Sequence, residues 1–138
     1  MIYTFPQLHA VQDVVAANAD PVSVGALLTP ILVVPLPIAI AAGDWFIVVT
    51  DFRGTGGTPG DRIIYEAAST GAAQFDVYAG RAREMLVNAL GTLGLAVTFL
   101  GIAINSGQGE ITIAGTMESG SLDVAAGDCR VAVLHLRQ

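Results

Sequence analysis

Lysine is missing from this chain, and charge of either sign is scarce. The six basic residues are all arginines, twelve residues are acidic, and the formal net charge is −6. Only 13% of the residues are charged, against about a quarter in an average soluble domain. A protein that binds nucleic acid needs basic side chains to neutralise phosphates. The composition therefore argues against nucleic acid as a partner.

Cysteine is the next scarcity. Cys129 is the only one, which excludes an intramolecular disulfide and a zinc site built on cysteines. It stands in an apolar run, where a buried thiol is the expected state. Residues 1–6 lack the basic and apolar regions of a signal peptide, so we expect none.

Catalytic and cofactor motifs are also missing. Neither His9 nor His135 has a carboxylate or a nucleophile at a recognised motif spacing, and no Gly-x-Ser-x-Gly elbow exists. The glycine-rich residues 54–60 have no Gly-Lys-Ser/Thr, and Pro59 stands where a dinucleotide-binding loop needs glycine. No carboxylate spacing fits a calcium loop. We expect no catalytic residue, no cofactor and no metal, and hence no enzyme.

Two uncharged stretches raise the question of a membrane span. Residues 26–42 contain Pro30, Pro35 and Pro37, which would break a helix. Residues 85–104 are just long enough to cross a bilayer. Their glycines and β-branched residues fit strands and turns at least as well. We do not expect a membrane partner, and a small membrane protein with a span at 85–104 stays as the lesser alternative.

Apolar residues make up 53% of the chain. A chain of 138 residues can form one domain around a single core. Because so few charges are left to cover its surface, we expect part of that surface to lie against other subunits.

Short β-forming segments separated by turn residues dominate from residue 21 onward. The strongest is 44–52, whose nearly continuous apolar run predicts burial on both faces. Residues 53–61 predict a glycine-rich turn or mobile loop. Residues 1–20 are expected to be an N-terminal arm or irregular segment, and 21–138 a single domain. The turn spacing predicts an all-β fold, a jelly-roll-like β-sandwich of about eight strands.

A near-repeat is the most informative internal signal. Ala-Ala-Gly-Asp occurs at 41–44 and again at 125–128, each time between a short strand and an apolar strand that ends near an arginine. Glycine suits a turn position with positive φ, and the aspartate can bond back to the turn's amides. We interpret the two copies as the same corner used twice in one sandwich.

This turn-and-strand pattern resembles the corners of jelly-roll domains. The ending, Gly-Asp-Cys-Arg-Val-Ala-Val-Leu-His-Leu-Arg-Gln, looks like the last strand of trimeric jelly rolls in tailed-phage decoration proteins, fibre heads and the tumour-necrosis-factor-like family. The likeness covers about residues 35–138 and is architectural, without a family-specific motif. It implies a homotrimer whose apolar strands line the threefold contact.

The expected function is a virion structural protein, a capsid decoration (cement) protein that bridges subunits of a phage capsid. Its partners would be copies of itself and a major capsid or other virion protein, at the capsid surface or tail. A fibre-head or receptor-binding module with ligand-binding loops is the alternative. The predicted subunit contact comprises Trp45, Ile47, Val49, Val131, Val133 and His135. The predicted partner-contact loop comprises Arg53, Thr55, Thr58 and Asp61.

Overall fold

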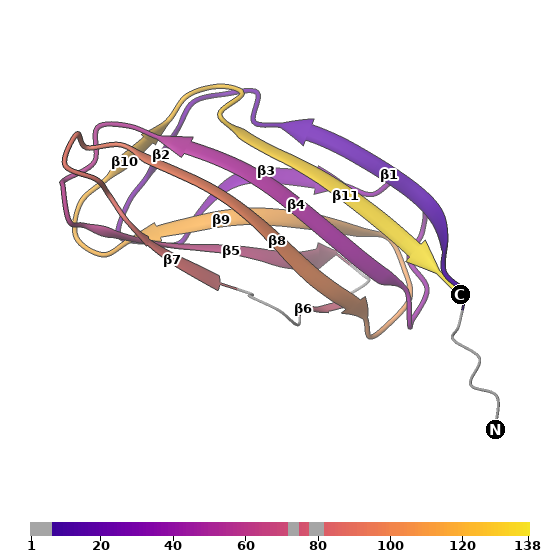
Figure 1. Cartoon of the computed structure of the whole chain (residues 1–138). Coiled ribbons are helices and arrows are strands. Elements are labelled where there is room, and N and C mark those ends of the chain that lie inside the picture. Colours follow the sequence, from indigo (N-terminus) through magenta and orange to yellow (C-terminus); the bar gives the residue numbers. More distant parts are fainter. Residues whose placement is uncertain (1–6, 72–74, 78–81) are drawn as a thin grey trace.

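The computed structural model describes residues 7–71, 75–77 and 82–138, and these contain strands, turns and loops but no helix (Figure 1). The strands are β1 (His9–Ala17), β2 (Val22–Val24), β3 (Thr29–Pro35), β4 (Trp45–Gly54), β5 (Arg62–Gly71), β6 (Phe75–Val77), β7 (Ala82–Leu86), β8 (Leu93–Ala103), β9 (Gly109–Met117), β10 (Leu122–Val124) and β11 (Cys129–Arg137). The predicted all-β fold is confirmed. β2, β6 and β10 have only three residues each, so the eight longer strands correspond to the predicted number.

The strands form two sheets that lie one over the other (Figure 1). One has five strands in the order β1-β11-β4-β8-β6, and the other has four in the order β3-β9-β5-β7. The short strands β2 and β10 pair with each other where the chain passes between the sheets. Every pairing is antiparallel. This two-layer arrangement is a β-sandwich.

The pairings are nested from the ends of the chain inward. β1 pairs with β11, β2 with β10, β3 with β9, β4 with β8 and β5 with β7. The chain is thus one long antiparallel ribbon that doubles back near β6. The ribbon is rolled so that β11 also lies beside β4, and β9 beside β5. This connectivity is that of a jelly roll.

The core lies between the sheets and is filled by alternate residues of each strand. In β4, Phe46, Val48 and Phe52 point inward, while Trp45 and Ile47 are half-buried on the outer face. Phe52 packs against Tyr65, whose hydroxyl lies 3.9 Å from the Cys129 sulfur. Cys129 is buried, so the predicted buried thiol is confirmed, and burial raises the pKa of this thiol to about 11.

The predicted N-terminal arm is wrong for residues 9–17, which form edge strand β1. Its register on β11 runs from His9 opposite Arg137 to Ala17 opposite Arg130. Val14 and Ala16 pack against the core. The small and polar residues of this strand, among them Ala10, Gln12 and Asp13, weaken the alternation, which is why the sequence did not reveal a strand. Residues 1–6 of the predicted arm lie outside the described residues.

The uncharged residues 85–104 divide into the end of β7, a turn and β8. Gly91 has a φ of 75° in that turn, where the chain reverses. Within the described part of the chain, no helix is long and apolar enough to cross a membrane.

The repeated Ala-Ala-Gly-Asp corner is confirmed. Gly43 and Gly127 have φ values of 90° and 81°. In each turn the aspartate amide donates to the first alanine's carbonyl, at 3.0 Å for Asp44 and 3.1 Å for Asp128. The Asp44 carboxylate also bonds back, accepting from the Ala41 amide at 2.8 Å. Both turns therefore use the same backbone geometry.

Candidate functional site

A buried polar cluster lies at the start of β4, where β11 ends. Asp44 is 2% exposed and His135 is fully buried. The Asp44 Oδ2 atom accepts hydrogen bonds from His135 Nε2 at 2.6 Å and from Arg137 Nη2 at 2.8 Å. Its Oδ1 atom accepts from Arg137 Nε at 2.9 Å, which makes the arginine contact bidentate. These hydrogen bonds replace the water molecules that the buried carboxylate cannot reach.

Gln12 of β1 completes the cluster and fixes the protonation of the imidazole. Its amide nitrogen donates to the Ile38 carbonyl at 2.9 Å, and its amide oxygen accepts from the Ile38 amide at 3.0 Å. This pair of backbone bonds sets the orientation of the amide. The Gln12 nitrogen, 2.8 Å from His135 Nδ1, must therefore donate to it. His135 is assigned as neutral, with its proton on Nε2.

Charge and hydrogen bonding set the pKa of Asp44. Burial alone would raise it, but hydrogen bonds from Arg137, Ala41 and His135 outweigh burial and lower the pKa from 3.8 to about 2. The same contact raises the pKa of the Arg137 guanidinium above its usual value. Asp44 and Arg137 therefore form a charged pair over the whole neutral range.

The cluster is suited to holding strands together. Both ring nitrogens of His135 are engaged, so neither is left to take a proton from a substrate. Its members join β1, β11 and the connection between β3 and β4. Sequence reasoning missed the cluster because Asp44 and His135 are 91 residues apart. Nowhere in the described residues, this cluster included, do three His, Cys, Asp or Glu side chains gather to hold a metal ion.

The predicted partner-contact loop is anchored at one of its ends. Asp61 is only 5% exposed and accepts from Ser119 N and Oγ, both at 3.1 Å, from Gly120 N at 2.8 Å and from Arg62 N at 2.9 Å. Burial opposes ionisation, but these bonds keep the pKa of Asp61 below its usual value. The loop is also bound to the β7–β8 turn, since Gly57 N donates to Gly91 O.

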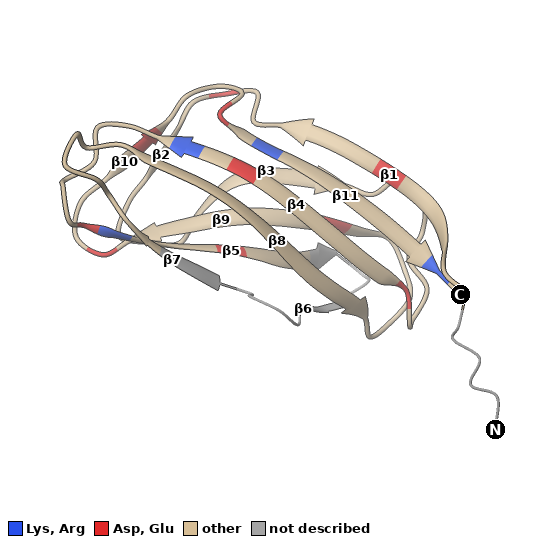
Figure 2. Cartoon of the chain, viewed as in Figure 1, with Lys and Arg blue, Asp and Glu red and all other residues tan. Residues whose placement is uncertain are grey.

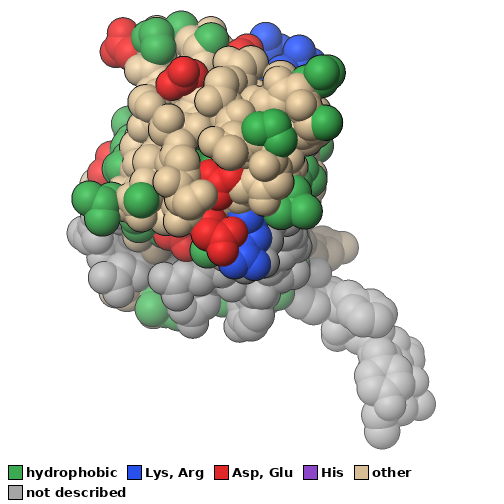
Figure 3. All heavy atoms as spheres, turned by 90° about the vertical axis from the view of Figure 1, so that its left-hand side faces the viewer, with side chains coloured by type: hydrophobic (Ala, Val, Ile, Leu, Met, Phe, Trp, Pro, Cys, Tyr) green, Lys and Arg blue, Asp and Glu red, His purple; other side chains and the backbone are tan. Residues whose placement is uncertain are grey.

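Asp61 therefore belongs to the fold and is not available to a partner. Arg53, Thr55 and Thr58 are exposed, as a partner contact would require. Figure 3 views the end of the molecule that carries these loops, where hydrophobic side chains stand around and within a surface made mostly of backbone and other uncharged side chains. Leu27 in the β2–β3 turn and Leu90 in the β7–β8 turn are among the most exposed large apolar residues.

The predicted subunit contact divides between the two faces of one sheet. Trp45, Ile47 and Val49 project from the outer face. Val131, Val133 and His135 are 2%, 1% and 0% exposed and point into the sandwich. On β11 the outward side chains are the alternate set, Ala132, Leu134 and Leu136. Because this strand is apolar on both sides, its sequence does not say which set faces the core.

The outer face of the β1-β11-β4-β8 sheet is apolar over most of its length. In register, Trp45 lies beside Leu136 and Ile102, and Ile47 lies beside Leu134 and Leu100. Charges on β4 and β11 occur only toward the strand ends (Figure 2). The opposite sheet carries a mixed outer face that includes Val33, Ile64, Glu66, Glu110, Thr112 and Thr116. We call the first surface the apolar face.

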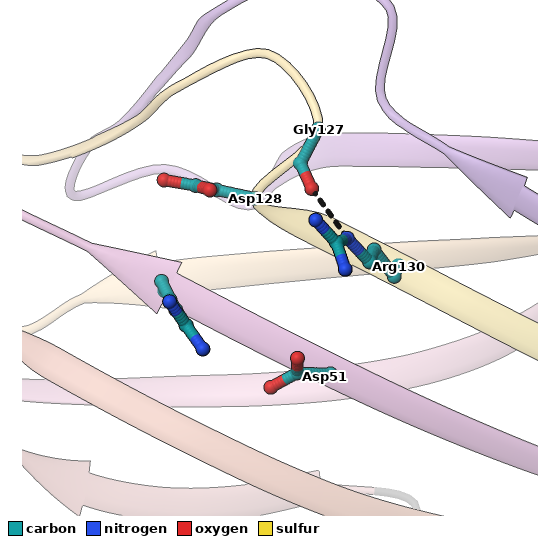
Figure 4. A pocket seen from close by; sticks show the side chains of 5 residues that line it. Asp51, Gly127, Asp128 and Arg130 are labelled. Carbon is teal, nitrogen blue, oxygen red and sulfur yellow. Dashed lines mark hydrogen bonds between the residues drawn. The ribbon is translucent and has the colours of Figure 1, made fainter.

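A group of four charges borders the apolar face at one end (Figure 4). Asp51 and Arg53 come from β4, and Asp128 and Arg130 come from the start of β11 and the turn before it. Asp51 is the direct cross-strand partner of Arg130. The Arg130 Nε atom donates to the Gly127 carbonyl at 3.0 Å. Among the described residues, no ion pair joins any of these four side chains to an opposite charge.

Comparison with known proteins gave no match to a family model, to a curated protein or to a solved structure.

Proposed function

We propose that this protein is a virion structural protein, a homotrimeric capsid decoration protein that stabilises a phage capsid by bridging its subunits. The observation that carries the proposal is the apolar face on a jelly roll whose other outer face is mixed. Leaving apolar surface in water is unfavourable by about 25 cal/mol per Å². Copies of the chain that cover this face remove that penalty, and jelly rolls are frequent in viral coats.

A decoration protein works by adding contact area without chemistry. The end of the molecule that carries the Arg53–Thr58 loop supports this role, because Asp61 fixes this loop to the β9–β10 turn and neighbouring turns present the exposed Leu27 and Leu90. A surface ordered before binding loses little conformational entropy when it docks. In this proposal that end contacts the capsid, and each trimer spans a boundary between capsid subunits.

The same loops favour the second candidate, a fibre head. Thr55 and Thr58 are exposed on a loop held by its neighbours, an arrangement that suits recognition of a receptor. A fibre head would bind to host cells as an isolated protein. A decoration protein would bind only to particles.

The test compares virus particles made with and without this protein. Antibodies to the chain should label the outside of intact particles in electron micrographs. Particles assembled without it should form normally but release their genome at lower temperature, and added protein should restore the wild-type release temperature. Labelling of tail tips alone would favour the fibre head. Absence from purified particles would overturn both virion roles.

A further inference from the structure

The side chains of the apolar face stand in rows across the strands. Reading from β11 through β4 to β8, the first row is Leu136, Trp45 and Ile102, and the second is Leu134, Ile47 and Leu100. The third row is Ala132, Val49 and Thr98, and the fourth is Arg130, Asp51 and Ala96. Apart from Thr98 these first three rows are apolar, and the fourth is charged. On the edge strand β1, Asp13 lies beside Leu134 of the second row.

The charged row has a defined polarity across the sheet. Its base, Arg130, lies on β11 and its acid, Asp51, lies on β4. Within the described residues neither takes part in an ion pair, although the two strands are neighbours. Arg53 and Asp128 repeat the acid and base with the strands exchanged, and the Arg53 amide donates to the Asp128 carbonyl. A charge on β11 of one copy could therefore pair with the opposite charge on β4 of a second copy.

We infer that copies of this chain meet through the apolar face around a symmetry axis parallel to the strands, with the β11 side of one copy against the β4 side of the next. Rotation about such an axis leaves each row at its own height. Apolar rows then meet apolar rows, and Arg130 of one copy meets Asp51 of the next. An axis across the strands would instead invert the rows and set charges against Trp45 and Leu136.

The size of the face sets the area of each contact. Four strands about 4.8 Å apart and four rows about 6.8 Å apart cover roughly 500 Å² in plane. In a dimer one contact uses all of this area, which is more than half of the ~800 Å² that each partner contributes to a standard interface, whereas a trimer divides it between two contacts per copy. Asp13, on β1, and the charged row place polar groups at the margin of an apolar centre, as in known interfaces. The inference rests on the proposed function for the number of copies, and on the register alone for the contact and the axis.

The first experiment places a charge on the face. Leu134→Asp should give a folded monomer by light scattering, whereas the wild type has the mass of a trimer. Ile64→Asp is the matched control, because Ile64 is an exposed apolar residue on the outer face of the other sheet. It should leave the trimer intact. Circular dichroism verifies that both variants are folded. A trimeric Leu134→Asp variant, or a monomeric wild type, would overturn the inference.

The second experiment tests the axis through its charges. Asp51→Arg and Arg130→Asp each place like charges at every contact, so each variant alone should dissociate at a higher protein concentration than the wild type. The difference should be largest at low salt, where repulsion is least screened. Mixing the two makes two of the three contacts in a trimer complementary. Exchanging both residues in one chain makes all of them complementary. If the mixture and the double variant dissociate as readily as the single variants, the axis is wrong.

The proposed contact and the proposed virion role can be contradicted independently of each other. Trimers that respond to these charges but never bind particles would support the contact and overturn the decoration role. A dimer with the same response would support the contact and the axis, and would overturn the threefold arrangement. Particle binding by a variant that remains monomeric would overturn the inference while leaving the virion role in place.

Discussion

At the scale of single residues, two neighbours on β11 have opposite environments. Val133 is 1% exposed in the core, and Leu134 lies on the apolar face. We predict that Val133→Asp unfolds the domain, because a carboxylate buried without a partner destabilises by several kcal/mol or more. The measurement is loss of the strand signal in circular dichroism at room temperature. Leu134→Asp is the control. A folded Val133→Asp variant would show that Val133 does not face the core.

Asp44 gives the stability of the domain a dependence on acid pH. Folding lowers the pKa of this carboxyl from 3.8 to about 2, so its contribution is complete above pH ~4 and is lost as the pH falls toward 2. The lowering corresponds to about 2 kcal/mol. We predict that the free energy of unfolding, measured in denaturant across this window, falls by that amount more in the wild type than in Asp44→Asn.

Asp44→Asn serves as the reference because it keeps the shape of the side chain without its titration. It should be less stable than the wild type at pH 7, since Arg137 and His135 lose their anionic acceptor. Parallel pH curves for the two proteins would mean that the Asp44 carboxyl is not held by the cluster.

At the scale of elements, the Asp61 side chain joins the β4–β5 loop to the β9–β10 turn. We predict that Asp61→Ala lowers the free energy of unfolding, because the amides of Ser119 and Gly120 lose their acceptor. Amide hydrogen exchange at Ser119 and Gly120 should accelerate, while β11 keeps its protection. Thr58→Ala, on the exposed part of the same loop, should leave both measurements unchanged. Equal effects of the two substitutions would show that Asp61 does not anchor the loop.

The elements show which local signals can be read from a sequence. Apolar β-forming segments between turn residues predicted most strands, and Ala-Ala-Gly-Asp predicted two corners with their positive φ values. The sequence predicts a turn or mobile loop at 53–61 but does not reveal its anchor, because the acceptor Asp61 and its donors at 119 and 120 are distant in the chain. The inward side of β11 was not predicted, since Val133 and Leu134 are equally apolar.

At the scale of the whole molecule, the sandwich class followed from turn spacing and composition. The nested pairing did not, because it depends on contacts between the two ends of the chain. The Gln12–His135–Asp44 cluster cannot be predicted for the same reason, since its residues come from distant segments and none of them stands out in its own segment. Pairing with β11 turns residues 9–17 from an expected arm into an edge strand.

That strand makes truncation informative. We predict that removal of residues 1–17 destabilises the domain strongly, because it uncovers one edge of β11 and deletes Gln12. The expected result is a lowered melting temperature and aggregation in the purified protein. Gln12→Ala, which removes only the side-chain bonds, should have a smaller effect. A truncated chain as stable as the full one would restore the arm to consideration.

The nested ribbon also has a kinetic consequence. Pairing β1 with β11 directly requires closing a loop of nearly the whole chain, which carries a large entropy loss. Once the inner pairs β5–β7 and β4–β8 have formed, each further pair closes only a short loop. We expect refolding to proceed from the centre of the ribbon outward, like a zipper. Pulse-labelled hydrogen exchange should then protect β8 amides before β1 amides, and the reverse order would rule this route out.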